Sequence, residues 1–351
     1  MSRWIKFALS LAVSALFMWW TFRDTRWVEM WASLRAANYL VLIPYMALML
    51  VIHVLRTLRW GNLLSGLEPV RFKALNEASA IGFMMLIVLP FRLGEFARPF
   101  LIAQRTSIRR SAAMTTIVLE RIIDGIIIAI LLRILMFFIE GETGDIAYIR
   151  VGANAMFLVF FSGFVFLLMA RWQHDRVVSI LRATMGRIAP KPTEKLIYIT
   201  EGFVSALRQL PDAKNTALYF LWTAIYWSLN GYGMSLLGSA FDCSGAVVSG
   251  CEQLHITVFQ GFVLLSVLII GIMIPAAPGS AGTFQAFILL GLGLFVSKEV
   301  VNSSGIAFAN LLWIAQLAQQ IVLGLVFMFL SHGSFSDLAH RLSEEQQSTS
   351  S

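Results

Sequence analysis

Apart from Arg133, which lies near the outer end of a predicted span and can reach the membrane surface, six charged side chains are expected at membrane depth, all in the first half of this chain. They are three arginines and three carboxylic acids: Arg92, Glu95, Arg98, Glu120, Arg121 and Asp124. At the centre of a membrane helix each charge would cost about 2.5–3.5 kcal/mol, so these groups must be paired. Glu120 and Asp124 are four residues apart and share one helix face. Two interpretations follow. The charges form a self-neutralising ion-pair network, or the arginines receive an anionic headgroup while the carboxylates orient them or exchange protons.

The pattern Pro-x-x-x-Gly-x-Phe interrupts an apolar stretch in each half of the chain. It occurs in LPFRLGEFARP, with Pro90, Gly94 and Phe96, and in IPAAPGSAGTFQA, with Pro278, Gly282 and Phe284. Proline and glycine unravel helices, and at membrane depth unravelled backbone is tolerated only where it is buried in protein or lines a cavity. Broken segments at corresponding positions of two halves are typical of a transport site. The two breaks therefore predict a carrier.

The second break contains no charged residues, and its exposed backbone groups are the candidate ligand contacts instead. Pro278, Gly279 and Gly282 lie just before a polar residue, Gln285. Glycines allow a ligand to approach the backbone closely, and the helix start that follows them presents N–H donors to an anion. The alternative is that these small residues only permit tight helix packing, which is common in membranes.

Composition indicates that these elements lie in a membrane. Hydrophobic residues make up 58% of the chain, charged residues 13%, and the mean hydropathy is +0.75. A soluble domain carries about 25% charged residues. The net charge of +7 does not indicate nucleic-acid binding, because most of the 27 lysines and arginines, including Arg56 and Arg59 at the end of a span, are predicted to lie on the cytoplasmic side. The same bias predicts that both termini are cytoplasmic. We expect the chain to be integral to the cell (inner) membrane.

The order of apolar segments predicts an all-α polytopic membrane protein of two inverted-topology repeats. Spans are expected near 4–22, 37–55, 112–139, 151–170, 216–241 and 306–330. The first repeat, 1–139, contains a broken re-entrant hairpin at 78–104. The second, 150–335, contains its counterpart at 255–297, which is either a hairpin or two full crossings. Each repeat thus has three transmembrane helices and a hairpin in opposite orientations, with six to eight crossings in all.

The sequence also allows predictions for three further segments. Apolar residues recur at helical spacing in 171–214, which predicts basic amphipathic helices on the cytoplasmic side. The polar stretch 336–351 is predicted to be a disordered tail. Cys243 and Cys251 fall in one outer loop, where they either form a disulfide or remain free thiols.

Motifs of catalysis and of cofactor binding are missing. The chain contains no G-x-x-x-x-G-K-[ST] loop, no H-E-x-x-H and no cysteine–histidine cluster. We therefore expect no cofactor, no metal and no catalytic residues.

The stretch LPFRLGEFARPFLIAQRTSIRRSAAMTTIVLERIIDGI resembles the lysylphosphatidylglycerol synthase transmembrane (flippase-like) family. The family pattern P-x-R-x-G-E-x-x-R is matched by Pro90, Arg92, Gly94, Glu95 and Arg98, and E-R-x-x-D by Glu120, Arg121 and Asp124. A second signature, P-x-x-P-G-x-x-G, is matched by Pro275, Pro278, Gly279 and Gly282.

The resemblance implies a module that moves an aminoacylated phospholipid between leaflets. Many members have Glu where this chain has Gln285, which argues against a proton role there. The chain also ends at residue 351 without an aminoacyl-transferase domain, so we expect a standalone member whose lipid could differ.

The favoured function is therefore a lipid translocase for a phospholipid or a polyprenyl-phosphate-linked lipid, with a polar site near the membrane midplane. One alternative is a membrane-embedded transferase that acts on polyprenyl-phosphate sugars. Another is a non-transporting scaffold, whose partner would be a separate lipid-synthesis enzyme.

Overall fold

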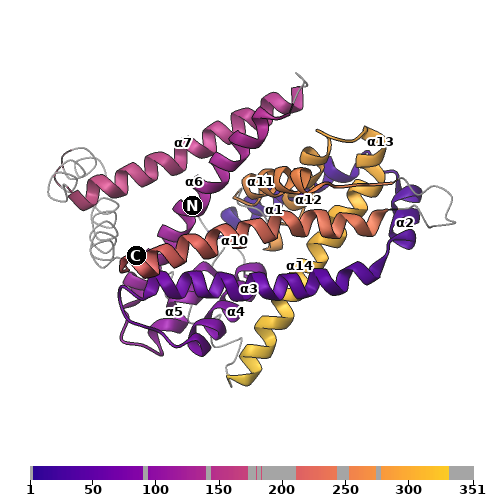
Figure 1. Cartoon of the computed structure of the whole chain (residues 1–351). Coiled ribbons are helices and arrows are strands. Elements are labelled where there is room, and N and C mark those ends of the chain that lie inside the picture. Colours follow the sequence, from indigo (N-terminus) through magenta and orange to yellow (C-terminus); the bar gives the residue numbers. More distant parts are fainter. Residues whose placement is uncertain are drawn as a thin grey trace.

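A computed structural model describes residues 3–89, 94–139, 144–172, 211–242, 253–273 and 278–331, together with the single positions 179 and 183. All regular secondary structure in these ranges is helical, and they contain no strand (Figure 1). The all-α prediction is therefore confirmed for the part of the chain that the structure describes.

The first half supplies six α-helices. They are α1 (Arg3–Phe22), α2 (Trp27–Ala36), α3 (Leu42–Leu64, continuous with the short helix η1 at Tyr39–Val41), α4 (Phe72–Val88), α5 (Ala97–Ala103) and α6 (Arg110–Phe137). The second half supplies α7 (Gly144–Trp172), α10 (Ala213–Gly238), η3 (Ser239–Phe241), α11 (Val258–Met273), η5 (Pro278–Ser280), α12 (Thr283–Leu292), α13 (Lys298–Val300), η6 (Val301–Gly305) and α14 (Ile306–Leu330).

Each of the six predicted spans corresponds to one helix, namely α1, α3, α6, α7, α10 and α14. Two continuous helical segments in the described ranges are long and apolar enough to cross a membrane, Tyr39–Leu64 with 26 residues and Lys298–Leu330 with 33 residues. At 1.5 Å per residue, even the shorter of them measures about 39 Å, which exceeds a hydrocarbon core of about 30 Å.

The predicted span 37–55 ends too early. Helix α3 continues to Leu64, so that Arg56 and Arg59 lie inside the helix rather than in a cytoplasmic flank. The stretch from residue 56 to 64 contains no proline, and Arg59 is fully buried. The helix can continue because its arginine finds partners in the protein interior, as described below.

Two helix pairs stand where hairpins were predicted. Helix α4 packs on α5 across the first break, and α11 packs on α12 across the second. The helices α5 and α12 have 7 and 10 residues, so they measure about 10 and 15 Å and are too short to cross a bilayer. The re-entrant course and the inverted repeats remain predictions.

Glycines allow the chain to turn or approach closely at both breaks. A Cβ atom on Gly94 would overlap the backbone of Leu86, so only glycine lets the turn before α5 lie against α4. In the second break, Gly279 and Gly282 have φ angles of +67° and +85°, in the region that glycine adopts without a steric cost.

Long helices from the two halves pack together. Helices α3 and α10 lie side by side along their length, α14 packs on α4, and α6 pairs with α7 (Figure 1). One hydrophobic cluster joins α3, α10, α11, α12 and α14 and includes Trp227, and a second joins α3, α4, α5 and α6 around Trp60. Two of the predicted charged residues contact these clusters, since Arg98 lies against Trp60 and Asp124 accepts a hydrogen bond from Trp227.

Several predictions concern residues outside the described ranges. They are Pro90 and Arg92 in the first break, Pro275 in the second, the cysteine pair Cys243 and Cys251, most of the amphipathic segment 171–214 and the tail 336–351.

Candidate functional site

The two carboxylates of α6 lie in a buried ion-pair network. Glu120 is 1% exposed and Asp124 is 8% exposed. Arg59 Nη2 donates to Asp124 Oδ1 over 2.7 Å and lies 3.7 Å from Glu120 Oε1. Arg98 Nη1 donates to the other oxygen of Glu120, Oε2, over 3.3 Å. The network therefore joins helices α3, α5 and α6 through two arginines and two carboxylates.

Arg59 was missed as a site residue by the sequence reasoning. It was assigned to the cytoplasmic end of a span, whereas its side chain is buried and bridges both carboxylates. A signal for this role existed in the sequence. Arg56 and Arg59 lie one helical turn apart in a stretch without a helix breaker, and Glu120 and Asp124 needed more than one cation.

The second half of the chain also contributes to the network. Trp227 Nε1 of α10 donates to Asp124 Oδ1 over 3.2 Å. Arg59 Nη2 donates to the hydroxyl of Tyr219, also on α10, over 3.5 Å. Asp124 thus accepts hydrogen bonds from α3 and from α10, which couples the ion pairs of the first half to a helix of the second half.

Aromatic rings hold the position of the second arginine. The guanidinium carbon of Arg98 lies 4.3 Å from the ring centre of Trp60 and 4.6 Å from that of Phe83. Trp60 is itself oriented by a hydrogen bond from its Nε1 to Thr116 Oγ1 over 3.0 Å. A Cβ atom on Gly82 would overlap the side chain of Arg98, so this glycine provides the space in which the arginine lies.

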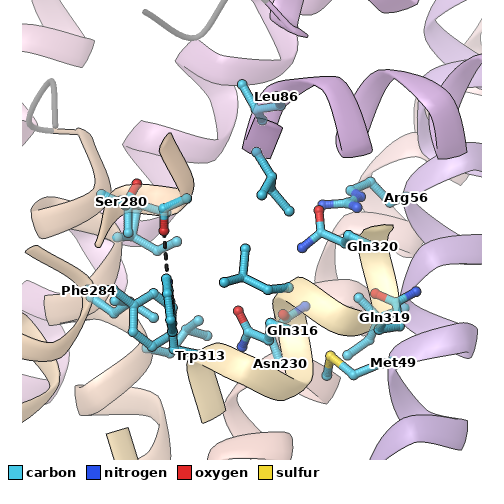
Figure 2. Close-up of a pocket in the computed structure, with 18 of the residues that line it drawn as sticks. Met49, Arg56, Leu86, Asn230, Ser280, Phe284, Trp313, Gln316, Gln319 and Gln320 are labelled. Atoms are coloured by element: carbon cyan, nitrogen blue, oxygen red, sulfur yellow. Dashed lines mark hydrogen bonds between the residues drawn. The ribbon is translucent and has the colours of Figure 1, made fainter. Parts of the chain in front are cut away.

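A cavity of about 240 Å³ lies beside this network, between the two helix breaks. Its wall includes Leu86 and Leu89 at the end of α4 and Pro278 to Ser280 of η5. Figure 2 shows Ser280 and Phe284 on one side of the opening and Arg56 with Gln320 on the other. Both halves of the chain therefore form the same cavity, and each contributes its broken segment.

Cations and amides form much of the polar part of the cavity wall. They are Arg56, Arg121, Asn230, Gln316, Gln319 and Gln320, and His53, Ser280, Tyr226, Trp227 and Trp313 add further polar groups. Some are already bound within the protein: Gln316 Nε2 donates to the hydroxyl of Tyr45 over 3.3 Å. In the described part of the chain, Gln319 Nε2 and the Nε atoms of Arg56 and Arg121 are buried and have no hydrogen-bond partner. The cavity thus contains unsatisfied donors that a ligand with acceptor oxygens could use.

The predicted site residues separate into groups by location. Arg98, Glu120 and Asp124 form the buried network. Arg121, Pro278 and Gly279 line the cavity, and the carbonyl oxygen of Gly279 accepts a hydrogen bond from Trp313 Nε1 over 2.8 Å. Gly94 and Glu95 lie in the turn that leads into α5, where Gly94 is buried and Glu95 is half-buried.

Gly282 and Gln285 lie at the start of α12 rather than in the cavity wall. Gln285 Oε1 accepts a hydrogen bond from the backbone N–H of Gly282 over 2.9 Å, and its Nε2 donates to Asn310 Oδ1 over 3.3 Å. This arrangement caps the helix and links it to α14. Gln285 therefore has a structural position in this protein.

The described residues contain no group of three or more histidine, cysteine or acidic side chains that could hold a metal ion. The arrangement instead suits the binding of a polar or anionic group next to charges that can exchange partners.

Comparison with protein families relates this site to a known group. The family model described as "Lysylphosphatidylglycerol synthase TM region" matches residues 7–331, which is nearly the whole chain. No curated protein and no solved structure matches the chain. The match contains the two helix breaks, the buried network and all the helices that line the cavity. The chain is therefore a membrane protein that belongs to the lysylphosphatidylglycerol synthase transmembrane-region family.

Proposed function

We propose that this protein is a translocase that moves a phospholipid or a polyprenyl-phosphate-linked lipid between membrane leaflets. The headgroup would pass through the cavity while the acyl chains stay in the lipid. The observation that carries this proposal is the composition of the cavity wall, since two broken segments and a set of arginine and amide side chains surround one space. Unwound backbone and unsatisfied donors at one site are typical of transporters.

The proposal includes the inverted-repeat architecture. The first break follows α4 and the second lies between α11 and α12, and residues next to both breaks line the cavity. In transporters built from inverted repeats, the substrate site lies near the midplane at the interface between repeats, and one repeat rocks against the other. This supports a mechanism in which the cavity opens alternately to the two leaflets.

In this mechanism the buried ion pairs hold the protein in one state until they are separated. Arg98 lies on the short helix α5, directly after the first break, while Glu120 lies on the long helix α6. Movement of the first break relative to α6 would separate this pair. Separating a buried pair without replacement costs about 3–5 kcal/mol, so it would not occur unless a ligand or a proton compensates.

The energy source would be the lipid gradient or proton coupling, because the chain contains no nucleotide-binding loop. Candidate proton-carrying groups are Glu95, Glu120 and Asp124. In this scheme, protonation of Glu120 would release Arg98, and the headgroup would bind the freed guanidinium.

The test is the movement of headgroup-labelled lipids across proteoliposomes that contain the purified full chain. We would compare the wild type with Glu120→Gln across a small panel of lipids. The matched control is Glu299→Gln, since Glu299 is an exposed residue of α13 far from the network in sequence. We expect the wild type and the control to move at least one lipid, and Glu120→Gln to reduce its rate about tenfold or more.

Folding is checked by size-exclusion elution and helical circular dichroism for each variant. Folded wild-type protein that moves no lipid would contradict the translocase. Turnover of a lipid-linked sugar donor would then favour the transferase alternative, and co-purification with a lipid-synthesis enzyme would favour the scaffold.

A further inference from the structure

We infer that the cavity selects a lipid headgroup that carries a phosphate and no cationic group, and that Arg56 with Gln319 receives this phosphate. The inference rests on the proposed function, because it assigns a headgroup class to the same cavity. It differs from the aminoacylated lipid that the family resemblance implies, since an aminoacyl headgroup carries ammonium groups.

The first argument is the charge of the cavity wall. Among the described lining residues there are two arginines, four side-chain amides and one histidine, and there is no carboxylate. The histidine, His53, already shares a hydrogen bond of 2.9 Å between its Nε2 and Asn76 Oδ1. A cationic headgroup would therefore meet two guanidinium groups and no opposite charge, whereas a phosphate would meet complementary donors.

The two carboxylates of the buried network beside the cavity are already committed to other partners. Asp124 accepts from Arg59 and from Trp227, and Glu120 accepts from Arg98. Trp227, which donates to Asp124, is itself a lining residue of the cavity. A cationic headgroup would have to displace an arginine to reach either carboxylate.

The summed charge of the groups around the cavity is also positive. The described charged residues of the network and the wall are Arg56, Arg59, Arg98, Arg121, Glu120 and Asp124, and Glu95 interacts electrostatically with Arg121. Four guanidinium groups against these three carboxylates leave one net positive charge. A phosphate diester carries one negative charge and would neutralise this excess.

The second argument is the geometry of Arg56. Its guanidinium carbon lies 3.2 Å from the ring centre of Phe83, so the planar group is stacked and its orientation is fixed. Its Nε is buried and has no partner, and Figure 2 shows its guanidinium next to Gln320 at the edge of the open space. A stacked guanidinium retains its in-plane N–H groups for a ligand with several acceptor oxygens, which is the geometry of phosphate recognition.

The third argument is Gln319. This residue is only 7% exposed, it lines the cavity, and its Nε2 has no hydrogen-bond partner in the described part of the chain. A buried amide donor without an acceptor is disfavoured in an empty site and becomes satisfied when an oxygen ligand enters. Gln319 of α14 and Arg56 of α3 thus both stand in the cavity wall, one from each half of the chain, and the Gln319 amide, which is covered by protein, would turn toward the space to donate to a ligand.

The experiment measures binding rather than transport, so that the two proposals can fail separately. A phosphatidylglycerol with a fluorescent acyl tail is bound to the purified full chain in uncharged detergent micelles. It is then displaced with phosphatidylglycerol, phosphatidylcholine, lysylphosphatidylglycerol or inorganic phosphate. We expect lysylphosphatidylglycerol to require about tenfold or more higher concentration than phosphatidylglycerol, with phosphatidylcholine between them.

Substitutions in the purified protein test which residues bind the phosphate. Arg56→Gln should weaken binding of the probe about tenfold or more, because it removes a charge-assisted donor, and Gln319→Leu about threefold. Arg56→Lys keeps the charge but not the planar fork, and should lie between the wild type and Arg56→Gln. The control is Arg35→Gln, an exposed arginine of α2, which should stay within about twofold of the wild type.

Equal or stronger displacement by lysylphosphatidylglycerol would overturn the inference, as would wild-type affinity in folded Arg56→Gln and Gln319→Leu. Inorganic phosphate that displaces the probe as well as phosphatidylglycerol does would overturn the assignment to a lipid. Selective binding of phosphatidylglycerol without transport would reject the translocase and keep this inference. Transport with a preference for the cationic lipid would support the translocase and reject this inference.

Discussion

Arg59 and Asp124, which are 65 residues apart in the chain, form the shortest ion pair of the buried network, with 2.7 Å between Nη2 and Oδ1. The side chain of Arg59 is completely inaccessible to solvent. Because the same guanidinium also lies 3.7 Å from Glu120, a single residue of α3 compensates two carboxylates of α6. The C-terminal part of α3 is therefore fixed to the middle of α6 by charge as well as by packing.

Loss of Arg59 should destabilise the protein strongly. In Arg59→Met, Asp124 and part of Glu120 would remain buried and uncompensated, which costs about 3–5 kcal/mol in comparable cases. Thermal unfolding of the purified protein in detergent should therefore shift to clearly lower temperature. The double variant Arg59→Met with Asp124→Leu should recover much of this loss, because it removes both charges. If the single variant unfolds like the exposed control Arg35→Met, the pair does not contribute to stability.

Trp227→Phe should separate the hydrogen bond from the packing of the ring. The replacement keeps an aromatic side chain beside the cavity but removes the N–H that donates to Asp124 Oδ1 over 3.2 Å. A hydrogen bond to a charged group contributes about 1.5–3 kcal/mol, so we expect a measurable fall in unfolding temperature. The control is Trp222→Phe on the same helix, where no hydrogen bond to the network is present in the described residues. Equal effects of the two substitutions would contradict a specific role for Trp227.

Gly82→Ala should displace Arg98. The added methyl would overlap the Cγ of Arg98, which cannot move away without moving the guanidinium from Glu120. Overpacking of this kind costs about 1–3 kcal/mol, and we also expect reduced lipid movement in proteoliposomes. Gly163→Ala on α7 is the matched control, since nothing lies within 4 Å of its new Cβ atom. That variant should be neutral or slightly stabilising because alanine favours a helix.

Gln285→Leu and Gln285→Glu should distinguish capping from proton transfer. Leucine removes the acceptor for the Gly282 N–H and the donor to Asn310, so it should lower stability by about 1 kcal/mol. Glutamate keeps the acceptor, and the amide of Asn310 can rotate to donate to it. We therefore expect Gln285→Glu to retain lipid movement within about twofold of the wild type. A transport rate that becomes strongly dependent on pH in Gln285→Glu would instead show that this position can carry a proton.

The membrane class, the helical fold and the family could all be inferred from the sequence by itself. Apolar runs of the right length and the match of Arg98, Glu120 and Asp124 to a family pattern are local properties, and local properties can be read along a chain. The ion pairing of these three residues was also anticipated as one interpretation, because charges at membrane depth must find partners.

The tertiary structure decided which groups are partners and which face the open space. Arg56 and Arg59 were read as a cytoplasmic flank, because a basic residue near a span end has the same sequence signature whether it faces water or a buried carboxylate. Trp227 and Gln319 reach the site from the second half of the chain, and only helix packing brings residues so distant in sequence together. Charge and hydropathy determine that a segment is helical and apolar, but the rotation and register of one helix against another determine which of its side chains meet.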